Sequence, residues 1–225
     1  KSSASHDLVF ENHKIISTGA LNILEATKKH APNSKVFIVG SGLQFINNEL
    51  PISEETDFEA RDPYSVARIQ SVYSARYYRT LGLKVYIGYL FNHDSEHRSP
   101  NCVTQKIVHF AKNIQSGAHT QLNIGNVFVK KEWGYAGDIV NGILDLVEQD
   151  KYSEAIIGTG VAYSIEKWLE LCFDLVGHDW KKFVITDSSY TPEYMTLVSN
   201  PTRIMSLGWK PKVDMKELAS IMMNY

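Results

Sequence analysis

A phenol and a guanidinium stand four residues apart in a segment that has the pattern of a helix. Tyr64 is followed by Arg68 within residues 63–81, so both side chains should lie on one helix face, one turn apart. A fixed positive charge favours the ionised form of a neighbouring phenol. Such a phenol can exchange a proton with a substrate hydroxyl or carbonyl near neutral pH. The same spacing also occurs in ordinary surface pairs, so the interpretation depends on the neighbouring segments.

Two apolar runs on either side of this helix predict a parallel sheet. Residues 35–40 (KVFIVG) and 84–91 (KVYIGYLF) are typical of buried strands, and a helical pattern covers residues 7–30. Helix, strand, loop, helix and strand in this order favour βαβ units in an α/β fold. The inner face of the first helix is expected to contain Leu8, Ile15, Ile16, Leu21, Ile23, Leu24 and Ala26.

Polar residues follow both predicted strands. Ser41 comes directly after the first, and Asn92 and His93 come after the second. Ligands of open parallel sheets lie beyond the carboxyl ends of the strands, so these side chains should converge with Tyr64. The Ser41 hydroxyl would orient a substrate oxygen, the phenol would pass the proton, and Arg68 would hold the phenolate and bind a cofactor ribose. This set suits hydride transfer at a secondary alcohol, with a nicotinamide as the hydride carrier.

The composition limits the partners and the compartment. The chain has 225 residues, 44% of them hydrophobic, and a net charge of −2. These values fit one large domain, or a domain with a smaller lobe, and indicate no nucleic-acid partner. No apolar run is long enough to span a membrane and the first residues do not resemble a signal peptide, so no membrane association is expected. Cys102 and Cys172 lie in apolar segments, which predicts free thiols in a cytoplasmic protein.

The half of the chain after Phe91 has a different pattern. Residues 92–101 are polar and loop-like, and shorter helices and strands follow them. We expect a smaller mixed lobe that packs over the ends of the sheet strands. Its predicted helices cover residues 103–116, 135–148, 164–176 and a segment from about 214, and its predicted strands cover 121–124, 155–158 and 183–185.

Motifs along nearly the whole chain resemble the extended short-chain dehydrogenase/reductase family. Within it the likeness is to GDP-mannose 4,6-dehydratases and related nucleotide-sugar enzymes. The motifs that carry this likeness are Ser41 with Tyr64-x-x-x-Arg68, residues 51–56 (PISEET) with 61–64 (RDPY), 90–95 (LFNHDS) with Arg98, 103–107 (VTQKI), 125–126 (GN) with 130–135 (KKEWGY), and 207–211 (LGWKP).

The resemblance implies a Rossmann-type parallel sheet with helices on both faces, and NAD or NADP as cofactor. Residues 1–91 would form the C-terminal part of the NAD(P)-binding domain, and 92–225 mainly the nucleotide-sugar lobe, with some segments returning to the sheet. Ser41, Tyr64 and Arg68 would be catalytic. The residues expected near the cofactor are Ser5, Tyr64, Arg68, Leu90, Asn92 and His93, and those expected near the nucleotide sugar are Ser41, Asn92, Val103, Lys106, Lys131 and Glu193.

Four departures from the family pattern change what is expected. The glycine-rich dinucleotide fingerprint is missing, and about 70 further residues upstream would complete the fold, or else the chain does not bind a dinucleotide normally. Arg68 stands in place of lysine. Leu43 stands in place of the glutamate that serves as base and acid for dehydration, and Tyr190 in place of a substrate-binding arginine.

The sequence therefore predicts an NAD(P)-dependent enzyme that oxidises or reduces C4 of a nucleotide-linked, GDP-type sugar, as a 4-dehydrogenase, 4-keto reductase or epimerase. The alternatives are a true 4,6-dehydratase and a non-catalytic relative that binds nucleotide sugar. In related enzymes the equivalent of helix 63–81 commonly pairs across a two-fold axis, so the resemblance implies a homodimer or homotetramer. His6, His93 and His97 do not have the spacing of a zinc site, and no metal is expected.

Overall fold

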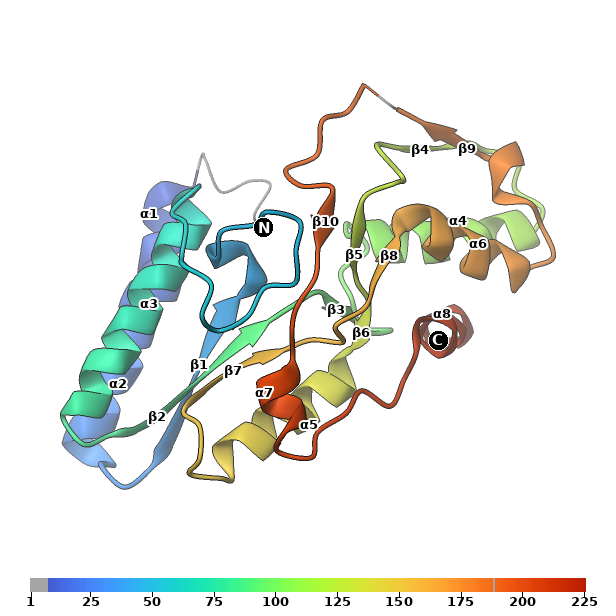
Figure 1. The fold of residues 1–225 in the computed structure, drawn as a ribbon. Helices are drawn as coiled ribbons and strands as arrows, with labels where there is room; N and C mark the ends of the chain where they lie inside the picture. The colour runs from blue at the N-terminus through green and yellow to red at the C-terminus, as the bar shows by residue number, and fades with distance from the viewer. Residues whose placement is uncertain (1–7, 188) are drawn as a thin grey trace.

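A computed structural model describes residues 8–187 and 189–225 of the chain (Figure 1). Its central feature is a parallel sheet with the strand order β1 (Lys35–Ser41), β2 (Lys84–Leu90) and β7 (Glu154–Ile157). Ser41 pairs in register with Leu90, so these two strands end at the same edge. The predicted parallel α/β sheet is confirmed, and it includes a strand from the second half of the chain.

Alternate residues of the central strand enter two different cores. Val85 and Ile87 pack with Leu24 of α2 (Gly19–His30) and Val72 of α3 (Pro63–Thr80). Tyr86 packs on the opposite face, with residues of α5 (Ala136–Val147) and α7 (Thr202–Met205). Because side chains alternate across a strand, helices cover both faces of the sheet, as predicted.

The first helix differs from its prediction. It consists of α1 (Val9–Asn12), a π-helix (His13–Thr18) and α2, and Leu24 is its only buried residue. The π-helix has a wider turn than an α-helix, so the two α-helical parts do not present one continuous face. Of the predicted inner positions, Leu8, Ile15, Leu21, Ile23 and Ala26 are exposed and Ile16 is half-buried.

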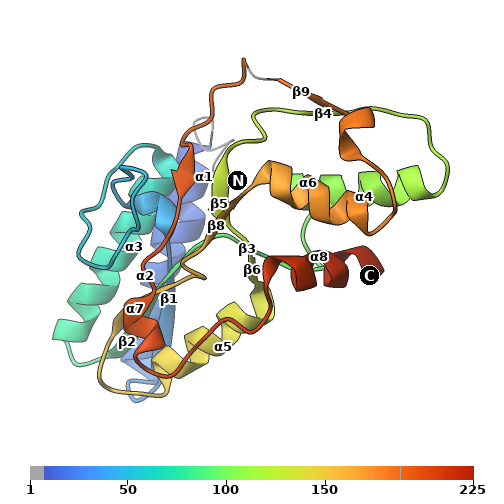
Figure 2. The ribbon, with the colours of Figure 1, turned by 45° about the vertical axis from the view of Figure 1, so that its right-hand side comes forward.

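The second half of the chain forms a lobe built on three helices. The core of this lobe contains residues of α4 (Val103–Gln115), α6 (Ile165–Asp174) and α8 (Met215–Asn224), which lie together at one end of the molecule (Figure 2). Three small sheets complete the lobe. They consist of β4 (Leu122–Ile124) with β9 (Val184–Thr186), β3 (His93–Asp94) with β6 (Gly134–Tyr135), and β5 (Lys130–Glu132) with β8 (Ala162–Ser164) and β10 (Thr196–Leu197). No helix of the described residues is long and apolar enough to cross a membrane.

A charged network ties β7 to α3. Glu154 accepts hydrogen bonds from Arg76 (2.8 and 2.9 Å), from the hydroxyl of Tyr89 (2.5 Å) and from Arg79. Burial alone would raise the pKa of Glu154, but the hydrogen bonds from Arg76, Tyr89 and Arg79 outweigh it and lower the pKa to about 2. The network therefore stabilises the ionised carboxylate in the folded state.

We expect Glu154→Gln to lower the free energy of unfolding by about 2 kcal/mol at neutral pH, after allowance for solvent screening. A lowered folded-state pKa stabilises the fold above the unfolded pKa of about 4.5, and this contribution is lost as the pH falls towards 2. Chemical denaturation of wild type and variant at several pH values measures the difference. Glu170→Gln, which removes an exposed pair with Lys167, is the matched control. Equal losses for both variants would contradict the role given to Glu154.

Candidate functional site

A cavity of about 430 Å³ lies at the carboxyl ends of β1 and β2. Residues at the end of β1, at the start of α3 and in the segment after β2 line it. Six of the predicted site residues come together on its wall, namely Ser41, Tyr64, Arg68, Leu90, Asn92 and His93. The cavity thus brings together residues from Ser41 to His93, which lie in different segments of the chain.

Tyr64 owes its position to a well-capped helix start. The carboxylate of Asp62 accepts a hydrogen bond from the backbone of Ser65 (2.6 Å), and the Ser65 hydroxyl bonds back to the Asp62 backbone N–H (2.9 Å). Pro63 occupies the first helical position, where no backbone N–H is required. Tyr64 is therefore the second residue of α3, and it is held at the cavity wall by the cap before it.

Arg68 lies over the ring of Tyr64, one turn further along α3. Its guanidinium carbon is 5.2 Å from the ring centroid, and its Nη1 donates a 2.7 Å hydrogen bond to the carbonyl of Val39 in β1. The predicted one-turn pairing is present, but the charge faces the plane of the ring and is fixed to the sheet. The buried Nε of Arg68 has no partner among the described residues.

We expect Arg68→Lys to retain activity within about threefold, because lysine keeps the positive charge beside Tyr64 although it loses the fork of donors. Arg68→Met, which removes the charge and keeps most of the stem, should lower kcat/KM by at least about tenfold. Steady-state kinetics of both variants in the full-length protein measures the contrast. Equal activity of the lysine and methionine variants would show that the charge at this position is not used.

Asn92 and His93 face the cavity from the segment after β2. His93 Nδ1 is 2.8 Å from the carbonyl of Phe91, and because a carbonyl only accepts, Nδ1 carries the proton of this hydrogen bond. Within the part of the chain that the structure describes, Nε2 makes no hydrogen bond. The buried Oδ1 of Asn92 has no partner among residues 8–187 and 189–225. Both residues therefore offer an unused polar atom beside the strand ends.

A cationic cluster adjoins this cavity. Arg98 lines the cavity, and its Nε is 3.3 Å from a carboxylate oxygen of Asp94, to which the Thr104 hydroxyl also donates. Burial lowers the pKa of Lys131, while the nearby Asp94 partly restores it. Burial also raises the pKa of Asp94, and Arg98 and Lys131 oppose that effect. Two cations thus share one carboxylate, an arrangement that leaves net positive charge for an anion.

Four further predicted residues do not line this cavity, namely Val103, Lys106, Lys131 and Glu193. Val103 is half-buried at the start of α4 and Lys106 is exposed on the same helix. Glu193 is exposed in the segment between β9 and β10. Ser5 lies outside the described residues. Arg98 and Leu197 are among the cavity residues that were not assigned a role from sequence. Arg98 was part of a family motif only, and Leu197 lies in a two-residue strand that has no sequence signal.

The departures from the family pattern are visible at the cavity and beside it. Leu43 lines the cavity and presents an apolar side chain there. A Cβ at Gly42 would lie 2.9 Å from the ring of Phe91, so the neighbouring position is restricted to glycine by packing. Tyr190 packs its ring on Gly125, where a Cβ would lie 2.9 Å from the ring. The wall therefore has no carboxylate at residue 43.

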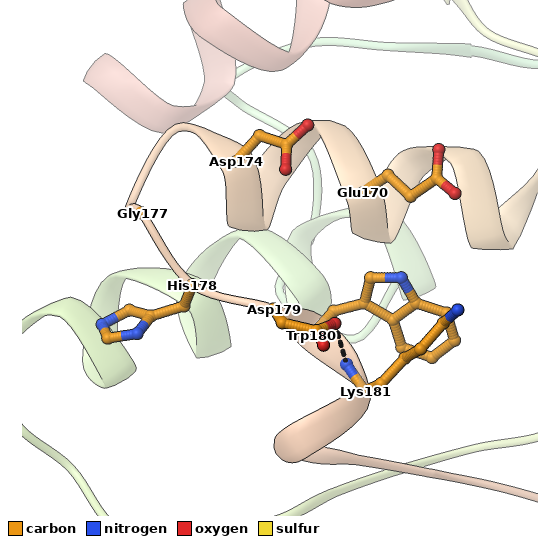
Figure 3. A pocket seen from close by; sticks show the side chains of 7 residues that line it. All are labelled: Glu170, Asp174, Gly177, His178, Asp179, Trp180 and Lys181. Atoms are coloured by element: carbon orange, nitrogen blue, oxygen red, sulfur yellow. Dashed lines mark hydrogen bonds between the residues drawn. The ribbon is translucent and has the colours of Figure 1, made fainter.

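A second cavity, of about 490 Å³, lies in the lobe between the end of α6 and a short 3-10 helix (Trp180–Lys182). Figure 3 shows Glu170 and Asp174 on α6 and Asp179 on the segment below this helix, where the Asp179 carboxylate accepts the backbone N–H of Lys181 (3.0 Å). None of its residues was predicted to belong to a site, and none also lines the cavity with Tyr64. Its chemistry is that of a solvated acidic surface.

The parallel sheet, with a serine and a Tyr-x-x-x-Arg helix at its strand ends, defines an extended short-chain dehydrogenase/reductase fold. The family model described as GDP-mannose 4,6 dehydratase matches residues 4–222, and the chain belongs to this family. GDP-mannose 4,6 dehydratase 2 of Arabidopsis thaliana is 33% identical over 218 residues, which cover 93% of this chain and 58% of that protein. GDP-mannose 4,6-dehydratase of Vibrio cholerae is 30% identical over 213 residues, or 81% of this chain and 57% of that protein.

Solved structures share the fold at lower identity. RMD from Pseudomonas aeruginosa complexed with NADPH superposes with a TM-score of 0.92 at 19% identity, over 100% of this chain and 77% of that one. UDP-glucose 4-epimerase from Thermotoga maritima with UDP-glucose gives 0.86 at 19% identity, over 100% and 73%. The chain thus spans less than two thirds of the length of the two dehydratases.

Proposed function

We propose that the full-length protein containing this chain is an NAD(P)-dependent oxidoreductase acting at C4 of a GDP-linked sugar. The observation that carries the proposal is the convergence of Ser41, Tyr64 and Arg68 on one cavity at the strand ends. Membership of a family named for a GDP-sugar enzyme supports the choice of substrate. NADPH in one structural neighbour and NAD in another support the cofactor.

The residues of the cavity fit a nicotinamide dinucleotide. Arg68 and Asn92 line the cavity, and the buried Nε of Arg68 and Oδ1 of Asn92 have no partner among the described residues, so polar groups remain at this wall for a ribose and a carboxamide to satisfy. A bound nicotinamide would accept or supply the hydride at C4. Tyr64 would remove the proton from the C4 hydroxyl, or return it to the carbonyl oxygen, and Ser41 would hydrogen-bond the same oxygen. Arg68 would keep its positive charge beside the Tyr64 ring, where its guanidinium carbon is 5.2 Å from the centroid.

Leu43 is the residue that argues against dehydration. Removal of water across C5 and C6 requires a group that takes a proton from C5 and delivers one to the leaving hydroxyl, and leucine can do neither. The family's named activity keeps a 4,6-dehydratase as the second candidate. That candidate requires another acid in the full-length protein to replace the missing glutamate.

The remainder of the nucleotide sugar would extend from the cavity towards the lobe. Arg98 and Lys131 would bind the diphosphate, because their shared carboxylate leaves net positive charge. We assign the nucleoside to Val103 and Lys106 of α4 and to Glu193, on the strength of the family motifs. Residues 1–91 would then belong to the cofactor domain and 92–225 mainly to the substrate lobe, with β7 returning to the sheet.

The helices on one face of the sheet suit self-association. Phe10 is 90% exposed, and Ile15, Ile23, Tyr73 and Tyr77 are each more than half exposed. Contiguous exposed apolar side chains mark interaction surfaces, and pairing of this helix face about a two-fold axis would form a homodimer, or half of a homotetramer. We place the protein in the cytoplasm, where its two free thiols would remain reduced.

Purified full-length protein tests the proposed function in two measurements. Denaturation should release a nicotinamide dinucleotide that is identified by its absorbance, and incubation with GDP-linked sugars should change the nicotinamide absorbance. The absence of both would favour the non-catalytic alternative, in which the protein only binds nucleotide sugar. Release of a 4-keto-6-deoxy sugar would instead establish the dehydratase.

A further inference from the structure

The residue that orients Ser41 is Gln44. Its side chain is 0% exposed, and its Oε1 accepts the backbone N–H of Ser41 over 2.8 Å. The two residues flank the 3-10 helix Gly42–Gln44, which follows β1 directly. Together they form a capping box, in which a side chain at each end satisfies the backbone of the other.

The Ser41 hydroxyl also takes part in the capping box, as an acceptor. The backbone N–H of Leu43 donates to Ser41 Oγ over 3.2 Å. This contact occupies one of the two lone pairs of the oxygen, so the hydroxyl proton and the second lone pair remain for a ligand. Ser41 is 8% exposed and lies on the wall of the cavity with Tyr64. Its hydroxyl can therefore donate to a ligand oxygen at the cavity wall.

Gln44 is an unusual choice for a fully buried position. Its Nε2 has no partner among the described residues, and an unpaired buried amide is unfavourable. A Cβ at Gly40 would lie 3.1 Å from Gln44 Oε1, so the amide packs directly on the strand that ends at Ser41. An apolar residue of similar shape would avoid the unpaired N–H group, but it would leave the Ser41 N–H without an acceptor.

We propose that Gln44 is a positioning residue for the reaction, and that its Oε1 fixes Ser41 so that the serine hydroxyl donates to the sugar O4. This inference rests on the proposed function. Loss of the acceptor would leave the backbone of Ser41 free to rotate, and small displacements of a group that contacts the reacting atoms reduce the rate strongly.

The test compares Gln44→Met, which keeps the shape and removes the acceptor, with Gln44→Glu, which keeps an acceptor oxygen. In the full-length protein Gln44→Met should lower kcat by about 10- to 100-fold with KM within about threefold, while Gln44→Glu should recover at least about a third of the wild-type kcat. In a Ser41→Ala background Gln44→Met should change kcat by less than about twofold, because the group it positions is gone.

Amide hydrogen exchange provides a readout that does not need turnover. The Ser41 N–H should exchange about tenfold faster in Gln44→Met than in the wild type and in Gln44→Glu. Equal exchange, equal kcat of the methionine variant and the wild type, or independent effects of the Ser41 and Gln44 substitutions would each overturn the proposal. A wild-type protein without turnover would overturn the proposed function, and the exchange rates would then still decide whether Gln44 fixes Ser41.

Discussion

Tyr64→Phe should lower kcat of the full-length protein by about a thousandfold, within the range of general acid–base catalysis. The phenyl ring would keep its position beneath the Arg68 guanidinium, and the helix cap formed by Asp62 and Ser65 would be unchanged. Only the hydroxyl would be lost, so substrate affinity and the free energy of unfolding should change little. Single-turnover kinetics with a GDP-linked sugar measures the effect.

Tyr73 provides the matched control on the same helix. It is 58% exposed and does not line the cavity, so Tyr73→Phe should leave kcat within about twofold of wild type. If Tyr64→Phe retained kcat to the same extent, proton transfer would not pass through Tyr64 and the catalytic assignment would be wrong.

Lys131→Met should raise KM for the nucleotide sugar by about 10- to 100-fold, because a hydrogen bond to a charged group is worth about 1.5–3 kcal/mol. Methionine keeps most of the apolar stem and removes the ammonium, which lies 4.8 Å from the centroid of the Trp133 ring. Burial lowers the pKa of Lys131, so its ammonium loses its proton below the usual pH. KM of the wild type should therefore rise with increasing pH earlier than an exposed lysine would predict, and KM of the variant should not follow this profile.

Lys130→Met is the control for this substitution. Lys130 is exposed on the same strand, and its side chain lies on the opposite side of β5 from Lys131. Its removal should leave KM within about twofold. Equal increases in KM for the two variants would indicate a general effect of charge on the lobe, and would contradict a diphosphate site at Lys131.

The sequence predicted the part of the fold that long apolar patterns specify. Residues 35–40 and 84–91 became β1 and β2, and 63–81 became α3. The same patterns placed Ser41, Asn92 and His93 at strand ends, because the carboxyl ends of parallel strands share one edge. The approach of these residues to Tyr64 was therefore predictable from topology alone.

Other features had no local signal. The strands β3, β6 and β10 have two residues each, too few for a period of two to be recognised. The π-helix at His13–Thr18 altered the exposure of the first helix, which an α-helical period cannot predict. The capping box between Ser41 and Gln44 and the approach of Leu197 to the cavity depend on how the chain leaves β1 and returns from the lobe.

The path of the C4 hydrogen tests the central claim most directly. Full-length protein would be incubated with GDP-mannose that carries deuterium at C4, together with oxidised NAD or NADP, and the position of the label would be determined by mass spectrometry and NMR. Chemistry confined to C4 by Leu43 predicts that the deuterium appears on the nicotinamide or returns to C4, with the C6 hydroxyl retained. Deuterium at C6 of a 4-keto-6-deoxy product would contradict it.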